Sequence, residues 1–246
     1  MNKNKKIWAI IPARSGSQSV KHKNIIEVKG KPLIAFTILL AKKILKVDKV
    51  VVSSDSKKYL RIAKKYGADI LHLRSKKSST NTASDLSFFK EIVYFYKNSE
   101  FDLPKYFLHL RPNCPIRKLS TLNKAVNFFL KNSYKFSSMR SVSKMSETSY
   151  KTFEIKNNLL KGLCGGSHNI EKMNKPKEFF KNTYMANGYI DIIKIDNILK
   201  KNILHGKKVI PFIVETPTVD IDSKNDLEYA KFLLNKDKYF KKSTKK

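Results

Sequence analysis

The stretch Ile7-Trp8-Ala9-Ile10-Ile11-Pro12-Ala13-Arg14-Ser15-Gly16-Ser17-Gln18-Ser19-Val20-Lys21-His22-Lys23-Asn24 decides the fold. It begins as an unbroken apolar run and changes within two residues into a polar loop that carries cations. An isoleucine-rich run bounded by proline is typical of a strand buried on both faces of a sheet. In the loop that follows, backbone N–H groups can approach an anion while Arg14, Lys21 and Lys23 neutralise it. The stretch therefore predicts an anion-binding loop behind a buried strand.

This loop lacks the glycine spacing of two common phosphate-binding fingerprints. Neither GxxxxGK[ST] nor GxGxxG occurs between residues 13 and 24. The alternative is a surface loop of a lysine-rich protein that simply follows a strand. The stretch by itself favours phosphate binding over that alternative.

The composition is that of a globular protein with one sizeable core. The chain has 246 residues and 41% hydrophobic content, so we expect a single domain over residues 1–246. No apolar run approaches the ~20 residues that span a bilayer. The apolar stretch behind the basic residues 1–6 is too short for a signal peptide. Two distant cysteines, Cys114 and Cys164, fit reduced thiols, so the sequence predicts a cytoplasmic protein without a membrane partner.

The charge is strongly positive, with 51 Lys+Arg against 20 Asp+Glu and a formal net charge of +31. A basic chain can bind nucleic acid through its phosphates. Here nearly all of the excess is lysine spread through every segment, whereas readers of base edges favour arginine. We therefore expect no nucleic-acid partner and interpret the charge as a field that attracts polyanionic small molecules.

Apolar strands and amphipathic helices alternate along the first part of the chain. Strands are expected at 7–12, 49–55 and 69–74. Helices are expected at 32–44 and around 59–63, the second closed by Gly67, which gives a β-α-β-α-β order and a parallel sheet. Further on we expect helices at 84–96, 121–130, 195–200 and 226–234, and strands at 106–110, 136–142, 187–193 and 209–214. The pattern loosens over 143–183, where a hairpin is expected at 151–162. So long an excursion indicates an inserted arm or lid.

Polar side chains gather where the predicted parallel strands end. These residues are Arg14, Lys21, Lys23, Asn24, Ser54, Asp55, Arg74, Arg111 and Arg117. In open α/β sheets, ligands bind at the carboxyl ends of the strands. The concentration of cations at this rim predicts a phosphate-bearing small molecule as the ligand.

Asp220 and Asp222 supply the opposite charge near the other end of the chain. In an extended strand, residues i and i+2 face the same side, so both carboxylates would converge on one point. Such a pair suits Mg²⁺, which completes its shell with water and substrate phosphates. The alternative is a solvated strand end in which Asp222 caps the helix that begins near Ser223. A cationic rim together with a carboxylate pair favours nucleotidyl transfer.

Several segments together resemble a known family. They are 10–17 with Lys23-Asn24, 30–34, 52–55, 110–117, Asn187-Gly188 and 220–222. In this order they resemble the acylneuraminate cytidylyltransferases, also called CMP-sialic acid synthetases. That group includes enzymes for legionaminic and pseudaminic acids and is related to the CMP-Kdo synthetases. The resemblance runs over nearly the whole chain.

The resemblance implies a Rossmann-like, three-layer α/β nucleotidyltransferase fold with a mostly parallel sheet. It also implies a homodimer built through an exchanged arm, which matches the inserted arm at about 143–183. In the implied Mg²⁺-dependent reaction, the anomeric hydroxyl of an acidic sugar attacks the α-phosphorus of CTP, giving CMP-sugar and pyrophosphate.

Site residues follow from the same resemblance. The nucleotide-binding set is Ala13, Arg14, Ser17, Gln18, Lys23, Asn24, Arg74, Ala83, Ser84 and Asp85. The substrate-binding set is Arg111, Lys177, Asn187 and Asp191. Asp220 and Asp222 are the expected metal ligands, and Arg14, Lys21, Lys23 and Asp222 are the expected catalytic group.

The chain departs from the family pattern on the phosphate and sugar sides. Gln18 stands where a lysine is expected, and Lys21 is a candidate to replace that lysine. Arg111 stands where a glutamine often contacts the sugar, and Lys177 lies near an arginine position. We expect a nine-carbon 2-keto-3-deoxy sugar acid as substrate. The alternatives are an eight-carbon Kdo-like acid, or a family member that binds its ligands with weak or no turnover.

Overall fold

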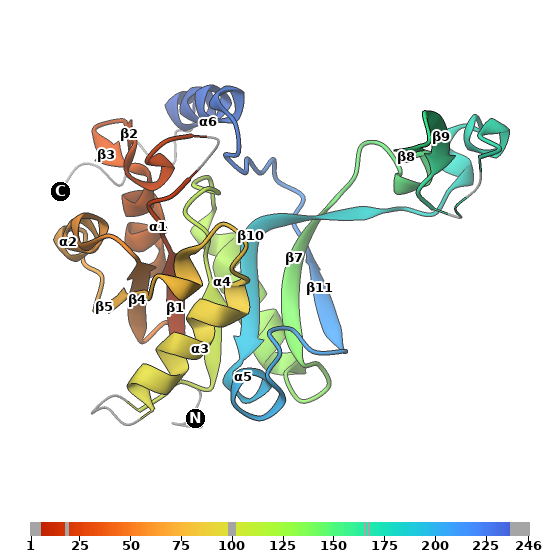
Figure 1. Cartoon of the computed structure of the whole chain (residues 1–246). Helices are drawn as coiled ribbons and strands as arrows, with labels where there is room; N and C mark the ends of the chain where they lie inside the picture. The colour runs from red at the N-terminus through yellow and green to blue at the C-terminus, as the bar shows by residue number, and fades with distance from the viewer. Residues whose placement is uncertain (1–5, 18–19, 98–101, 165, 167, 237–246) are drawn as a thin grey trace.

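The computed structural model describes residues 6–17, 20–97, 102–164, 166 and 168–236. Its centre is a seven-stranded sheet in the order β11-β7-β10-β6-β1-β4-β5 (Figure 1). The strands are β1 (Ile7–Pro12), β4 (Lys49–Ser54), β5 (Ile70–Leu73), β6 (Tyr106–His109), β7 (Ser138–Lys144), β10 (Tyr184–Lys194) and β11 (Val209–Ile213). Strand β10 runs antiparallel to both of its neighbours, and the other pairs are parallel. The predicted mostly parallel sheet is therefore confirmed.

Helices cover both faces of this sheet. Helices α1 (Leu33–Ala41), α2 (Lys57–Lys65) and α4 (Leu119–Asn132) share one core with alternate residues of β1, such as Ala9 and Ile11. Helices α3 (Asp85–Tyr96) and α5 (Ile195–Lys201) share the second core with Trp8 and Ile10. Because β1 buries side chains on both faces, it forms the middle of a three-layer α/β fold, as predicted. In the described part of the chain, no helix is both long and apolar enough to cross a membrane.

A third, smaller core lies beside the sheet. It joins Val20, from the loop after β1, to α1, to the segment before α6 and to α6 itself (Lys224–Lys236). The short hairpin of β2 (Glu27–Val28) and β3 (Lys31–Pro32) contributes Val28 to it. This core holds the start and the end of the chain together.

Strands β7 and β10 continue past the sheet as a two-stranded ribbon that carries an arm (Figure 1). The hairpin predicted at 151–162 is present as β8 (Phe153–Lys156) and β9 (Leu159–Gly162). The rest of the arm consists of loops and three short 3-10 helices, η3 (Ser149–Lys151), η4 (Glu171–Met173) and η5 (Lys177–Phe179). Two further 3-10 helices, η1 (Lys23–Ile25) and η2 (Lys77–Ser79), lie in the loops after β1 and β5.

Several predicted boundaries differ from those of the structure; for example, α4 spans Leu119–Asn132 instead of 121–130, and β7 spans Ser138–Lys144 instead of 136–142. Helix α1 ends at Ala41 instead of residue 44, because the chain leaves the helix through a turn at residues 42 and 43. Strand β10 begins at Tyr184 instead of Asn187, since it pairs with β7 out into the arm. The segment containing Asp220 and Asp222 is not a strand. It runs beside the sheet and buries Ile221 in the third core instead.

Candidate active site

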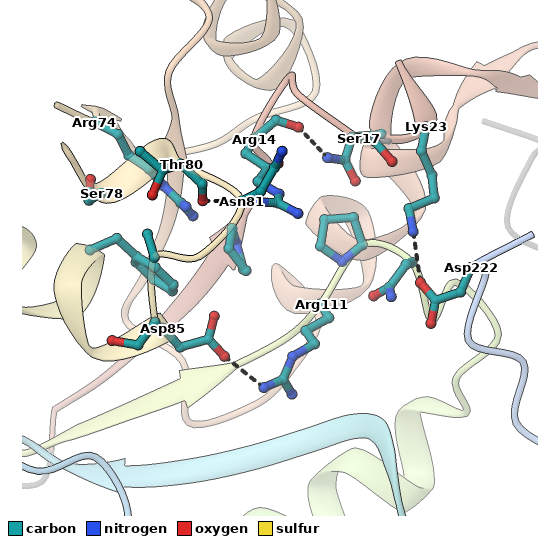
Figure 2. A pocket seen from close by; sticks show the side chains of 17 residues that line it. Arg14, Ser17, Lys23, Arg74, Ser78, Thr80, Asn81, Asp85, Arg111 and Asp222 are labelled. Carbon is teal, nitrogen blue, oxygen red and sulfur yellow. Dashed lines mark hydrogen bonds and ion pairs between the residues drawn. The ribbon is translucent and has the colours of Figure 1, made fainter. Parts of the chain in front are cut away.

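A cavity of about 320 Å³ lies at the carboxyl ends of the parallel strands (Figure 2). Its wall comes from the loops after β1, β5 and β6, from the start of α3 and from the segment before α6. The lining residues are Pro12, Arg14, Ser17, Lys23, Asn24, Arg74, Ser78, Thr80, Asn81, Ala83, Ser84, Asp85, Phe88, Arg111, Pro112, Asn113 and Asp222. Thus residues more than 200 positions apart in the chain share one cavity.

The loop after β1, residues 13–24, is called the β1 loop below. Asp55, at the end of β4, accepts hydrogen bonds from the Ser15 backbone N–H (2.7 Å) and from Ser15 Oγ (2.8 Å). Asn24 Nδ2 donates to the Arg14 carbonyl at 3.0 Å, which joins the two ends of the loop. Asp55, expected at the rim, therefore holds the β1 loop in place and does not line the cavity.

Arg74 is buried in the wall of the cavity. Its Nε donates to Ser53 Oγ at 2.9 Å, and its guanidinium carbon lies 4.0 Å from the centre of the Phe88 ring. Burial lowers the pKa of Arg74 to about 10, although Asp85, Asp55 and Glu91 oppose this. Nη2 is buried and has no hydrogen-bond partner. An oriented donor of this kind favours a ligand that presents an acceptor atom.

The polar loop after β5, residues 75–84, is organised by a carboxylate from α3. Glu91 accepts from Ser75 Oγ at 2.5 Å and from Ser78 Oγ at 2.8 Å. Burial raises the pKa of Glu91, but these hydrogen bonds lower it by more. From the other side of the cavity, Arg14 Nη1 donates to the Thr80 carbonyl at 3.0 Å. This loop and the β1 loop therefore meet at the mouth of the cavity, as Figure 2 shows.

Arg111 forms ion pairs with two carboxylates. Its Nη2 lies 2.9 Å from Asp85 Oδ2, at the rim, and its Nη1 lies 3.0 Å from Asp191 Oδ2, on β10. Burial lowers the pKa of Arg111, but Asp191 and Asp85 raise it by more. Asp191 is only 1% exposed and does not line the cavity. Asp191 thus lies behind Arg111, and its contact with substrate stays a prediction.

Arg117 is not a rim cation, contrary to prediction. It is 4% exposed, and its guanidinium donates to the carbonyls of Tyr189 (2.7 Å), Gly188 (3.1 Å) and Arg111 (2.7 Å). Such a side chain connects backbone segments and does not line the cavity.

Asp222 and Lys23 close the cavity on the side opposite Arg74. Lys23 Nζ lies 2.9 Å from Asp222 Oδ1 and also donates to the Ile221 carbonyl. The alternative role predicted for Asp222 was to cap α6. Neighbouring residues make that cap instead. Ser223 Oγ accepts from the Asp226 N–H at 3.2 Å, while Asp226 accepts from the backbone N–H groups of Asp222 and Ser223. The Asp222 carboxylate is therefore not the cap.

Asp220 lies deeper than Asp222. Its Oδ1 is buried without a hydrogen-bond partner, and burial together with the nearby Asp222 raises the pKa of this carboxyl. A buried, unsatisfied carboxylate oxygen beside a second carboxylate fits a cation ligand. In the described part of the chain, no group of three or more His, Cys, Asp or Glu side chains is arranged to hold a metal. The pair could thus supply only part of a metal's shell.

The cavity brings together most of the predicted nucleotide-binding residues: Arg14, Ser17, Lys23, Asn24, Arg74, Ala83, Ser84 and Asp85. Lys21 is exposed and Ala13 is buried, and neither lines the cavity. Gln18 lies outside the described residues.

Two predicted substrate contacts lie elsewhere within this chain. Asn187 is buried and donates to Ser143 Oγ at 2.8 Å. Lys177 lies in the arm, where it lines a second cavity of about 570 Å³. Seven lining residues were not predicted as site residues: Ser78, Thr80, Asn81, Pro12, Phe88, Pro112 and Asn113. The absence of large apolar side chains from 75–85 was the available signal for the first three.

A family model described as Cytidylyltransferase matches residues 8–219. Because this match covers most of the chain, the chain belongs to the cytidylyltransferase family and is a nucleotidyltransferase.

The chain is 30% identical over 226 residues to the N-acylneuraminate cytidylyltransferase of Escherichia coli O18:K1:H7, covering 92% of this chain and 51% of that protein. It thus spans about half the length of this relative. It is 27% identical to the CMP-N,N'-diacetyllegionaminic acid synthase of Legionella pneumophila, covering 92% and 94% of the two chains. Among solved structures, CMP:2-keto-3-deoxy-manno-octonic acid synthetase complexed with CTP aligns with a TM-score of 0.66 at 15% identity, covering 94% of this chain and 98% of that one. This likeness shows the fold alone.

Proposed function

We propose that this cytidylyltransferase transfers the CMP group of CTP to a nine-carbon 2-keto-3-deoxy sugar acid and releases pyrophosphate. One observation carries the proposal: the cationic β1 loop closes against Asp222 across a cavity, in a chain matched by the Cytidylyltransferase family model. The sugar's anomeric hydroxyl attacks the α-phosphorus, and the bond from the α-phosphorus to the bridging oxygen of the leaving pyrophosphate breaks.

The charges in the cavity suit a nucleoside triphosphate. Among the described residues, neither Arg14 nor Arg74 forms an ion pair, so both charges are available to a ligand. Arg14 and Lys23 lie on the β1 loop, where they would bind phosphate oxygens. The unpartnered Nη2 of Arg74 would donate to the ring carbonyl of cytosine. Fixed donors of this kind stabilise the charge that builds up on the phosphates during transfer.

Asp220 and Asp222 would hold Mg²⁺. The unsatisfied, buried Oδ1 of Asp220 and the neighbouring Asp222 carboxylate fit a hard cation that takes few protein oxygens. When bound, the ion would neutralise phosphate charge and orient the triphosphate. Two cations of the β1 loop would then act on the nucleotide. Lys23 would move from Asp222 to a phosphate oxygen, and Arg14 would keep the β1 loop closed over the nucleotide.

The sugar is proposed from the printed names of the relatives, which include N-acylneuraminate and legionaminic acid enzymes. Arg111 is the cation of the cavity nearest to β10, but Asp85 and Asp191 already neutralise it. It is therefore suited to donating hydrogen bonds to hydroxyl groups, and the sugar carboxylate would need another cation.

We propose that a second copy of the chain supplies that cation through its arm. The arm exposes large apolar side chains, among them Ile155 (77%), Leu163 (61%) and Phe179 (74%), which are costly to leave in water. A homodimer that buries them would carry Lys177 of one copy toward the other copy. Light scattering on the purified protein tests the dimer, and Ile155→Glu should produce monomers.

The reaction is tested with purified protein, CTP, Mg²⁺ and a panel of nine-carbon and eight-carbon acids. Pyrophosphate should be released with at least one nine-carbon acid, and neither ATP nor UTP should replace CTP. Release only with the eight-carbon acid would move the proposal to the Kdo-like alternative. The absence of pyrophosphate with every acid would favour a member that binds without efficient turnover.

Gln18 motivates that last alternative, because it replaces an expected lysine. Gln18→Lys should raise turnover if a phosphate contact is vacant in this chain. Unchanged turnover would mean that another cation already makes the contact. Since Lys21 is exposed and outside the cavity lining, Lys21→Gln measures whether it reaches the phosphates when CTP is bound.

A further inference from the structure

Strand β10 contains a bulge next to the Asp pair. Its pairing with β7 shifts between Ala186, opposite Val142, and Asp191, opposite Arg140, so the bulged strand has three extra residues there. Side chains satisfy the backbone groups that leave the ladder: the Tyr189 N–H donates to Asn187 Oδ1 at 3.2 Å, and the Ile190 N–H donates to Ser141 Oγ at 2.9 Å. Side chains of Asn187 and Ser141 therefore support the bulge.

Gly188, at the centre of this bulge, lies against Asp220. Its φ is +63°, in the left-handed region, and a Cβ added to it would lie 2.9 Å from Asp220 Oδ2 and 3.5 Å from Asp220 Cγ. Any side chain at position 188 would thus push the Asp220 carboxylate away. Two features favour glycine there: the left-handed backbone conformation, and the space that the Asp220 carboxylate occupies.

The bulge is held in place from the side of α1. The buried Arg117 guanidinium binds the carbonyls of Gly188 and Tyr189, and its Nη1 donates to Thr37 Oγ1, in α1, at 3.3 Å. It also binds the Arg111 carbonyl, in the loop after β6. One side chain therefore fixes β10, the β6 loop and α1 relative to one another.

We propose that Gly188 and Arg117 are positioning residues for the Asp pair: Gly188 forms the surface on which the Asp220 carboxylate rests, and Arg117 fixes that surface. In this arrangement the backbone of β10 sets where Asp220 lies relative to Asp222, and so sets the affinity for a divalent cation. The inference rests on the proposed function, because it concerns the metal that would serve that reaction.

The test compares Gly188→Ala with Gly30→Ala in the full chain. Gly30 also has a left-handed φ, +68°, but nothing lies within 4 Å of an added Cβ, so this control carries the backbone strain alone. Mn²⁺ binding is titrated by electron paramagnetic resonance without nucleotide, and Asp222→Asn identifies the signal from the Asp pair. Gly188→Ala should weaken that binding by about 10-fold or more, the usual effect of a lost supporting contact around metal ligands. Gly30→Ala should bind Mn²⁺ like the wild type.

Arg117→Lys provides the second variant, because it keeps a cation but loses the planar fork of donors through which Nε and Nη2 reach the three carbonyls. It should also weaken Mn²⁺ binding, whereas Thr37→Val, which removes only the contact with α1, should change it little. Circular dichroism melting identifies any variant that does not fold. If Arg117→Lys does not fold, the inference is tested by comparing Mn²⁺ affinity in Gly188→Ala and Gly30→Ala. Any of three results would overturn the inference. The first is equal Mn²⁺ affinity in Gly188→Ala and in the wild type, and the second is an equal loss of affinity in both glycine variants. The third is that the wild type shows no Mn²⁺ binding that depends on Asp222. Pyrophosphate release by the wild type is measured separately, so a failure of the proposed function is recognised independently.

Discussion

Lys23 and Asp222 stand 199 positions apart in the sequence, and their side chains form an ion pair of 2.9 Å across one end of the cavity. Lys23 also donates to the Ile221 carbonyl, so it joins the β1 loop to the segment that carries the Asp pair. The same Lys23 would be needed by the phosphates, and the same Asp222 by the metal. The ion pair therefore keeps both groups neutralised until their ligands arrive.

Asp222→Asn should reduce turnover by about 100-fold or more with little loss of stability, because it removes one charge that would hold the metal. The carboxylate is 70% exposed and takes no part in the helix cap, so the fold does not depend on it. Turnover with saturating Mg²⁺ and thermal melting measure the two effects.

Ser223→Ala is the matched control for that variant. It removes the cap of α6 and should lower the free energy of unfolding by about 1 kcal/mol while leaving turnover near the wild-type value. Wild-type turnover in Asp222→Asn would contradict the metal role proposed for Asp222.

Lys23→Met should tighten Mn²⁺ binding in the absence of nucleotide, because the ammonium group no longer competes for Asp222. A partly exposed ion pair is worth up to about 1 kcal/mol, which corresponds to roughly fivefold in affinity. The same variant should weaken CTP binding, as calorimetry would show. Weaker Mn²⁺ binding in Lys23→Met would mean that Lys23 orients Asp222 instead of competing for it.

The two carboxylates that pair with Arg111 should contribute differently to the free energy of unfolding. The Asp191 side chain is 2% exposed and the Asp85 side chain is 40% exposed. Arg111→Gln leaves Asp191 buried beside the more distant Arg140, 3.8 Å away, and beside His109, 3.9 Å away, whose pKa is lowered by burial. It should cost about 3 kcal/mol in urea unfolding. The double variant Arg111→Gln/Asp191→Asn should recover much of that loss.

Asp85→Asn provides the control for this cycle, since it removes only the rim partner. It should cost less than about 1 kcal/mol. A cost for Asp85→Asn equal to that of Arg111→Gln would contradict the importance assigned to the buried partner.

His72 should make the protein acid-sensitive. Burial lowers its pKa from 6.5 to about 4, with Arg74 adding to the shift and Glu91 opposing it. The folded state then keeps His72 neutral, while the unfolded chain takes up a proton below pH 6.5. The contribution of neutral His72 to the free energy of unfolding is therefore fully present above pH 6.5. It falls as the pH drops toward 4, by up to about 3 kcal/mol.

Urea unfolding at pH 7 and at pH 4.5 measures this loss. His72→Gln should make the decrease smaller, although it gives up the contact between His72 Nδ1 and Ser53 Oγ at 2.9 Å. His168→Gln, at an exposed position in the arm, should leave the decrease unchanged. If the free energy of unfolding decreases as much in His72→Gln as in the wild type, groups other than His72 cause the acid sensitivity.

Local patterns in the sequence were sufficient to predict the layers of the fold. Trp8 and Ile10 alternate with Ala9 and Ile11, and that alternation identifies a strand buried on both faces. The place of β10 between β6 and β7 could not be predicted, because pairing between strands distant in sequence leaves no periodic signal. The bulge at Gly188 depends on that pairing and was missed for the same reason.

The cations of the site could be predicted because they directly follow strands, but their partners could not. Arg74 and Arg117 look alike in the sequence. One keeps an unpartnered N–H in the wall of the cavity, and the other donates to three carbonyls behind it. Which of these occurs depends on tertiary packing. The position of Asp191 behind Arg111 was missed because it, too, is set by packing and not by sequence spacing.

The third core has a consequence for biosynthesis. It packs Val20, made early, against Leu227, Ala230 and Leu234, which are among the last of the described residues to be made. Synthesis runs from the N-terminus, so the strands of the sheet, the last of which ends at Ile213, are made before α6. The β1 loop therefore lacks its packing partner until α6 has been made. We expect the β1 loop to be the last wall of the cavity to be held in place in a nascent chain.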